Sequence, residues 1–158
     1  MRSVQSWLDE YSESHQHRFN KIIHWVCVPL ILLSLSGLLW SIPMPGFLAA
    51  VSPLLNWGVV VLVVALLYYY ILAWRLAVGM TLVAILVIAL VDAASRLPVS
   101  LWRLSLAVFV AAWIGQFIGH KIEGRKPSFF KDLQFLLIGP LWLLAAVYRH
   151  THVATGRS

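Results

Sequence analysis

Polar side chains that can bind a metal ion recur in two segments far apart in the sequence. In the first, Asn20 and His24 are four residues apart, and His17 precedes His24 by seven. Helical spacing would align these three on one face, whereas His15, nine residues before His24, would point away unless the helix begins after it. Because neutral imidazole is a common metal ligand, this face is a candidate half of a metal site.

The second segment repeats the same kinds of side chain. One helical face would carry four residues at successive spacings of three, four and three: Trp113, Gln116, His120 and Glu123. Imidazole and carboxylate ligands with open positions suit non-haem Fe(II), and amides can support them from outside the ligand set. Alternatively, Asn20 and Gln116 hydrogen-bond to each other and only hold two helices together.

The composition indicates that these segments belong to a membrane protein. Of 158 residues, 61% are hydrophobic, and only 12 Lys and Arg and 6 Asp and Glu are available to cover a surface. A soluble globular enzyme is therefore disfavoured. The net charge of +6 does not indicate nucleic acid, because the basic residues lie at the ends of apolar runs. The single cysteine, Cys27, cannot form an internal disulfide.

The apolar runs predict an all-α integral membrane protein, with residues 1–158 in one membrane domain. A polar N-terminal segment, residues 1–23, precedes four predicted transmembrane helices at residues 24–42, 57–74, 76–91 and 104–119. The third follows Arg75 so closely that the turn before it must be very tight. A basic loop, 121–132, leads to a fifth apolar segment, 133–148, which Gly139 and Pro140 interrupt. We expect this segment to be re-entrant or interfacial, with a fifth span as the alternative.

Lys and Arg in short loops predict the orientation, because they are retained on the cytoplasmic side. The loop 121–132 carries four basic residues and the connection 43–56 carries none. Four crossings would therefore place the N-terminus and the Lys121 loop in the cytoplasm, although Arg96 and Arg103 on the other face count against this. The host membrane would be the plasma membrane of a bacterium or the endoplasmic reticulum of a eukaryote.

Two motif blocks resemble a known family. They read Tyr11-xxx-His15-xxxx-Asn20-xx-Ile23-His24-xxxx-Pro29 and Trp113-xx-Gln116-Phe117-x-Gly119-His120-xx-Glu123-xxx-Pro127. The pattern is similar to that of small multi-pass membrane proteins related to the yeast 2-hydroxy fatty acid dioxygenase of phytosphingosine breakdown. The resemblance covers almost the whole chain, while the intervening spans match in hydrophobicity alone.

The resemblance implies an Fe(II)-dependent α-oxidation, in which a long-chain 2-hydroxy fatty acid and O₂ give the acid one carbon shorter. It implies three iron ligands, His15, His24 and His120, with Asn20, Gln116 and Glu123 in supporting or additional catalytic roles. Helical spacing favours His17 over His15, whereas the motif favours His15. We side with the motif, because a chain break between Ser12 and Asn20 would remove the objection from spacing.

The substrate head group would lie at the membrane interface and its acyl chain among the spans. Three basic residues could attract the carboxylate: Lys121, Arg125 and Lys126. Their alternative role is retention of the loop on the cytoplasmic side. The expected partners are thus the fatty acid, O₂ and membrane lipid, with no nucleic acid.

The chain departs from the family pattern at two places. Glu123 follows His120 by three residues where the fungal form has four, although both spacings stay on one helical face. Ala146 stands where the family has a carboxylate, and we do not expect His150, one turn further on, to replace it.

Two other classes of function remain open at this point. In a b-type haem protein, His24 and His120 would ligate one haem from facing helices. In a metal-free scaffold or lipid-packing protein, the polar side chains would only join helices, and loss of either histidine would alter stability alone.

Overall fold

The computed structural model describes residues 3–13, 15–52, 54–124 and 129–150, and the regular structure in them is entirely helical. The predicted all-α class is therefore confirmed for this part of the chain. The helices follow in the order α1 (Val4–Glu13), α2 (Arg18–Trp40), α3 (Gly46–Ala49), α4 (Trp57–Ser95), α5 (Leu101–Glu123) and α6 (Phe129–His150).

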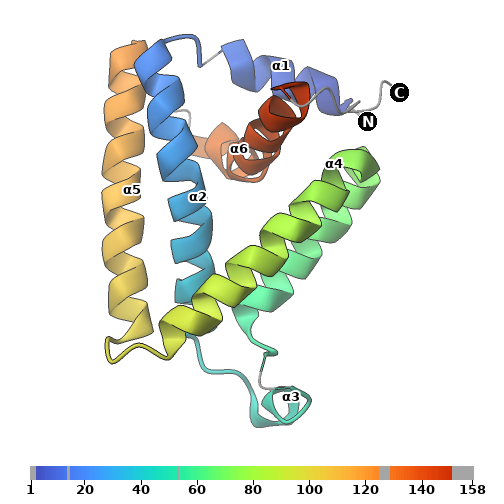
Figure 1. Cartoon of the computed structure of the whole chain (residues 1–158), viewed down its shortest axis with the longest axis vertical. Helices are drawn as coiled ribbons and strands as arrows, with labels where there is room; N and C mark the ends of the chain where they lie inside the picture. Colours follow the sequence, from blue (N-terminus) through green and yellow to red (C-terminus); the bar gives the residue numbers. More distant parts are fainter. Residues whose placement is uncertain (1–2, 14, 53, 125–128, 151–158) are drawn as a thin grey trace.

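Helices α2 and α5 lie side by side and antiparallel, so that the start of α2 and the end of α5 meet at one end of the molecule (Figure 1). Each has 23 residues, which corresponds to about 35 Å at about 1.5 Å per residue. This length is sufficient for the roughly 30 Å hydrocarbon core of a bilayer.

Small residues allow α2 and α5 to approach closely. A Cβ built on Gly115 would lie 2.6 Å from Cys27 Sγ, and one built on Gly119 would overlap Asn20 Oδ1. Gly37 of α2 faces Ser105 of α5 in the same way. Because lipid tails are as apolar as leucine, helix association inside a membrane depends on such close contacts between small residues.

Helix α4 reverses direction within its 39 residues. At Ala73 the backbone leaves the helical region (φ −161°, ψ 80°). Tyr70 Oη and Thr81 Oγ1 then lie 3.0 Å apart, although eleven residues would separate them by about 16 Å along a straight helix. Figure 1 shows the two halves of α4 side by side.

This reversal joins two of the predicted transmembrane helices into one helical stretch. In the part of the chain that the structure describes, three helices are long and apolar enough to cross a membrane: α2, α4 and α5. The predicted number was four, and α4 is counted once here because the predicted spans 57–74 and 76–91 are its two halves. The turn between them lies at Ala73, two residues before Arg75.

Helices α1 and α6 pack together at the end of the molecule where α2 begins (Figure 1). Leu8 and Tyr11 of α1 belong to the same buried cluster as Ile138, Leu141 and Trp142 of α6. The predicted polar segment 1–23 thus contains a helix with a buried apolar face and the first turn of α2. The apolar part of α6, Leu137–Arg149, is about 20 Å long, which is short for a crossing.

The glycine contacts predict a specific packing defect. Gly115→Ala places a methyl group against Cys27 Sγ, and overpacking of this kind costs about 1–3 kcal/mol. We expect a lower thermal midpoint of unfolding in detergent, measured by circular dichroism. Gly46→Ala, where a built Cβ has no neighbour within 4 Å, is the matched control and should leave the midpoint unchanged or raise it.

Combining Gly115→Ala with Cys27→Ala should restore the midpoint, because the second change removes the sulfur that the methyl group meets. Equal destabilisation in the presence and absence of Cys27 would show that this contact does not limit the approach of the helices.

Candidate metal centre

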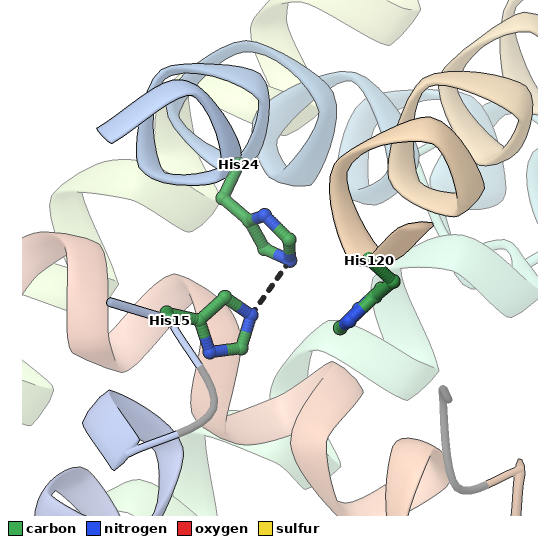
Figure 2. Close-up of side chains that lie close together, drawn as sticks. All are labelled: His15, His24 and His120. Atoms are coloured by element: carbon green, nitrogen blue, oxygen red, sulfur yellow. Dashed lines mark hydrogen bonds between the residues drawn. The ribbon is translucent and has the colours of Figure 1, made fainter. Parts of the chain in front are cut away.

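Three histidines from different elements converge at the end of the molecule where α1, α2, α5 and α6 meet. His15 lies in the connection between α1 and α2, His24 in the second turn of α2, and His120 in the last turn of α5. His15 and His24 are 98% buried, and His120 is half-buried. One ring nitrogen from each lies within 4.8 Å of the others. Figure 2 shows the three rings turned toward a common point.

Backbone carbonyls orient two of the rings. His15 Nδ1 lies 2.6 Å from the Tyr11 carbonyl oxygen, and His24 Nδ1 lies 2.9 Å from that of Asn20. A carbonyl can only accept a hydrogen bond, so each Nδ1 carries the proton and donates it. Each neutral ring is thereby left with an unprotonated Nε2, the arrangement typical of a metal-binding histidine.

The two Nε2 atoms lie only 2.8 Å apart (Figure 2). A hydrogen bond between them would require one ring to be positively charged. Burial opposes this charge, since it lowers the pKa of His15 to about 4 even though the hydrogen bond to Tyr11 acts in the opposite direction. Two lone pairs therefore face each other at neutral pH, and a cation bound by both would remove their repulsion.

The distances fit a metal ion. Two nitrogen ligands bound at about 2.1 Å and at right angles lie about 3.0 Å apart, close to the separation of His15 Nε2 and His24 Nε2. His120 contributes a third nitrogen within 4.8 Å, so a modest side-chain movement would complete a set of three. Three imidazoles with further positions open suit a catalytic site for a transition metal.

Two aromatic side chains form a wall beside the histidines. The Tyr11 ring stacks on His15 at 4.1 Å between centroids, and the Trp142 ring lies 5.8 Å from His15. Trp142 Nε1 donates a hydrogen bond to Ser12 Oγ at 2.8 Å, which ties α6 to the end of α1. No site role was predicted for Trp142 from the sequence. Tyr11 belongs to the first motif block, and its spacing of four residues from His15 is the signal that could have placed Tyr11 beside the histidines.

Glu123 anchors the turn that carries His15. Its two carboxylate oxygens accept hydrogen bonds from the backbone N–H groups of Gln16 (2.8 Å) and His17 (2.9 Å) and from Asn20 Nδ2 (2.9 Å). These donors surround the N-terminus of α2, where backbone N–H groups lack partners within the helix. The carboxylate thus joins the end of α5 to the start of α2 and is engaged outside the group of three histidines.

The two predicted amides do not pair with each other. Asn20 donates to Glu123, while Asn20 Oδ1 and Gln116 Oε1 are buried and have no hydrogen-bond partner among the described residues. The alternative of an Asn20–Gln116 bond that only joins the helices is therefore not supported. Trp113 Nε1 is also buried and finds no hydrogen-bond partner in the part of the chain that the structure describes. Buried polar atoms left in this state are uncommon, and all three belong to the helix faces that carry His24 and His120.

The structure separates the roles of His15 and His17. Helix α1 ends at Glu13 and α2 begins at Arg18, so the chain breaks between Ser12 and Asn20 as expected. His15 turns inward to His24, whereas His17 is exposed and caps α2, with its Nδ1 accepting a hydrogen bond from the Phe19 N–H.

Of the three predicted basic residues, only Lys121 lies within the described part of the chain. Lys121 is exposed on the last turn of α5. Arg125 and Lys126 lie outside the described residues, as does the side chain of His150. Ala146 is half-buried in α6.

The geometry disfavours a haem between His24 and His120. Their ring centroids are 5.2 Å apart, and the His15 ring lies 4.1 Å from one and 5.5 Å from the other. A porphyrin plane between the two axial ligands would have to occupy the space that His15 fills.

Comparison with known proteins identifies relatives of the chain. Residues 1–151 match the family described as 2-hydroxy-palmitic acid dioxygenase Mpo1-like. The chain is also 29% identical over 146 residues to the 2-hydroxy-palmitic acid dioxygenase MPO1 of Saccharomyces cerevisiae. The aligned region covers 89% of this chain and 77% of the yeast protein. No solved structure matches. The resemblance predicted from the two motif blocks is confirmed.

The convergence of three imidazoles predicts metal binding that depends on each of them. We expect three substitutions to reduce the metal content of the purified protein at least tenfold: His15→Ala, His24→Ala and His120→Ala. The protein is equilibrated with Fe(II) under argon, and its metal content is then measured by elemental mass spectrometry. His17→Ala is the matched control, because that side chain is exposed and should leave the content unchanged. Equal metal content in all four variants would exclude the site.

Proposed function

Because this chain belongs to the Mpo1-like family, we propose that it is an Fe(II)-dependent dioxygenase that shortens long-chain 2-hydroxy fatty acids by one carbon. The observation that carries the proposal is the convergence of three buried or half-buried histidines. Two of them are held by backbone carbonyls with Nε2 unprotonated. The name of the yeast relative, a 2-hydroxy-palmitic acid dioxygenase, supports the substrate class.

The reaction balances without an external reductant. A 2-hydroxy acid R–CH(OH)–COOH and O₂ give R–COOH, CO₂ and H₂O, so the bond between C1 and C2 breaks. C2, which carries the hydroxyl group, loses three electrons, and the carboxyl carbon C1 loses one electron. These four electrons reduce O₂. An iron ion held by His15, His24 and His120 would supply the site at which O₂ and the 2-hydroxy acid are brought together.

The other residues hold and shield this site in our proposal. Glu123 and Asn20 fix the turn that carries His15 to the start of α2. Tyr11 and Trp142 cover His15 from one side and limit the access of water. The buried Gln116 Oε1, without a partner within the described residues, is free to accept a hydrogen bond from a substrate hydroxyl.

Basic side chains would attract the substrate carboxylate to this end of the molecule. Lys121 follows His120 in the sequence, and its side chain is exposed. We assign attraction of the carboxylate to Lys121, Arg125 and Lys126. Charges at this position raise the local concentration of an anionic head group at the membrane surface.

We propose that α2, the two halves of α4, and α5 form four crossings, with α6 embedded at the interface. This places the histidines near the cytoplasmic surface, together with Lys21, Arg75 and Lys121, as the retention of basic residues there requires. The reversal at Ala73 supports two crossings by α4.

Cysteine labelling tests this topology. In a Cys27→Ser background, single cysteines at Lys21, Arg75 and Lys121 should be protected from an impermeant maleimide added outside intact cells, while cysteines at Ser52 and Leu97 should react. Labelling of the Lys21 and Lys121 positions from opposite sides of the membrane would contradict the shared site.

Product analysis tests the activity. Membranes containing the protein, supplied with Fe(II), O₂ and 2-hydroxypalmitic acid, should form the C15 acid, measured by mass spectrometry. We expect a loss of at least 100-fold in His120→Ala membranes and under argon, with His17→Ala as the matched control. Metal bound through His120 without any shortened acid would indicate another substrate. The absence of both would favour the metal-free scaffold.

A further inference from the structure

A cavity of about 290 Å³ lies between α2, the two halves of α4, and α6. Its walls are almost entirely hydrocarbon, and leucine, valine, alanine and methionine side chains supply most of them. The cavity lies on the α6 side of α2, away from the interface that α2 makes with α5.

The two hydroxyl groups in the wall are satisfied within the protein. Ser36 Oγ donates a hydrogen bond to the Leu32 carbonyl at 2.8 Å, and Tyr69 Oη donates one to the Leu137 carbonyl at 2.6 Å. The wall therefore offers few hydrogen-bonding groups to a bound ligand. A ligand for such a space is an alkyl chain, because a polar group would lose its bonds to water without replacement.

One face of α2 connects this cavity to the histidines. The residues His24, Val28, Leu32, Leu35 and Leu39 follow at helical spacings that place them in one stripe. The first belongs to the histidine cluster and the last three line the cavity. Eight residues separate His24 from Leu32, which corresponds to about 12 Å along the helix.

We propose that this cavity binds the distal part of the alkyl chain of the 2-hydroxy fatty acid and sets the chain length that the enzyme accepts. The inference rests on the proposed function. An extended chain advances about 1.2 Å per bond, as an extended polypeptide backbone does, so a carboxylate at the histidines would bring roughly the tenth carbon to Leu32. A C16 acid would fill the cavity with its last carbons, whereas a C8 acid would end before it.

Val28 and Gly139 lie between the histidines and the cavity. A Cβ built on Gly139 would lie 3.2 Å from Tyr11 Oη and 3.5 Å from Val28 Cγ1, so the glycine leaves the space of one methyl group between α6, Tyr11 and Val28. The neighbours of Gly139 on α6 include Pro140, which cannot donate the backbone hydrogen bond of a regular helix.

Substitutions in the wall test the assignment through the ratio of two activities. Ala84, 96% buried, lines the cavity, and Ala84→Leu fills part of it. We expect kcat/KM for 2-hydroxypalmitic acid to fall at least tenfold while that for 2-hydroxyoctanoic acid changes less than twofold. Ala107→Leu, the same change at an exposed position of α5, is the matched control and should preserve the ratio.

A second variant enlarges the cavity, which keeps the test decisive if Ala84→Leu does not fold. Leu62→Ala should shift the preferred acid from C16 toward C18 or C20. Metal content equal to that of the unmodified protein verifies that the histidine site is intact in each variant.

The outcomes separate the inference from the proposed function. If the unmodified protein shortens neither acid, the proposed function is wrong. If it shortens both and the wall variants change the two activities in parallel or not at all, the cavity does not hold the substrate chain. Parallel loss would indicate that the space accommodates a lipid chain of the bilayer or only supports the fold.

Discussion

The close approach of α2 to α5 is the contact on which the rest of the structure depends. Gly115 and Gly119 carry no side chain where Cys27 and Asn20 lie, so the two helices approach closely at these positions. Only at this separation do His24 and His120, on different helices, reach one cluster. The same approach allows Glu123 to span from the end of α5 to the backbone of Gln16 and His17. A membrane provides no water to drive helices together, so this contact rests on packing and hydrogen bonds.

The histidine cluster combines groups that would be unfavourable separately. Buried imidazoles with facing lone pairs repel each other, and burial lowers the pKa of His15 to about 4, which keeps that ring neutral at physiological pH. Carbonyl groups hold the rings in this state, and Tyr11 and Trp142 restrict their movement. Such strain persists only where surrounding structure enforces it. In the proposed function these nitrogens would act as preorganised ligands at a membrane surface, where an amphipathic acid would place its head group in polar surroundings and its chain among apolar helices.

Much of this arrangement could be predicted from local sequence. Apolar runs predicted the helices, and the spacing of Asn20 with His24 and of Gln116 with His120 predicted two polar faces. That the predicted spans 57–74 and 76–91 belong to one helical stretch was not predicted, because the reversal at Ala73 needs only one residue outside helical geometry and no glycine or proline marks it. A supporting or catalytic role was expected for Glu123, but its backbone partners were not predicted either, because the N–H groups of Gln16 and His17 lie more than 100 residues away in the sequence.

The sequence by itself determined the membrane environment, the helical class and the position of every histidine at the end of an apolar run, because these follow from composition and from the helical period. Helical spacing favoured His17 and the motif favoured His15, and the tertiary structure shows that His15 turns inward. That choice depends on the direction of the chain between α1 and α2, which the carboxylate of Glu123 fixes from the end of α5. It also decided that Trp142 covers the site and that α2, α4 and α6 enclose an apolar cavity. Such features arise from contacts between elements distant in sequence, about which local spacing carries no information.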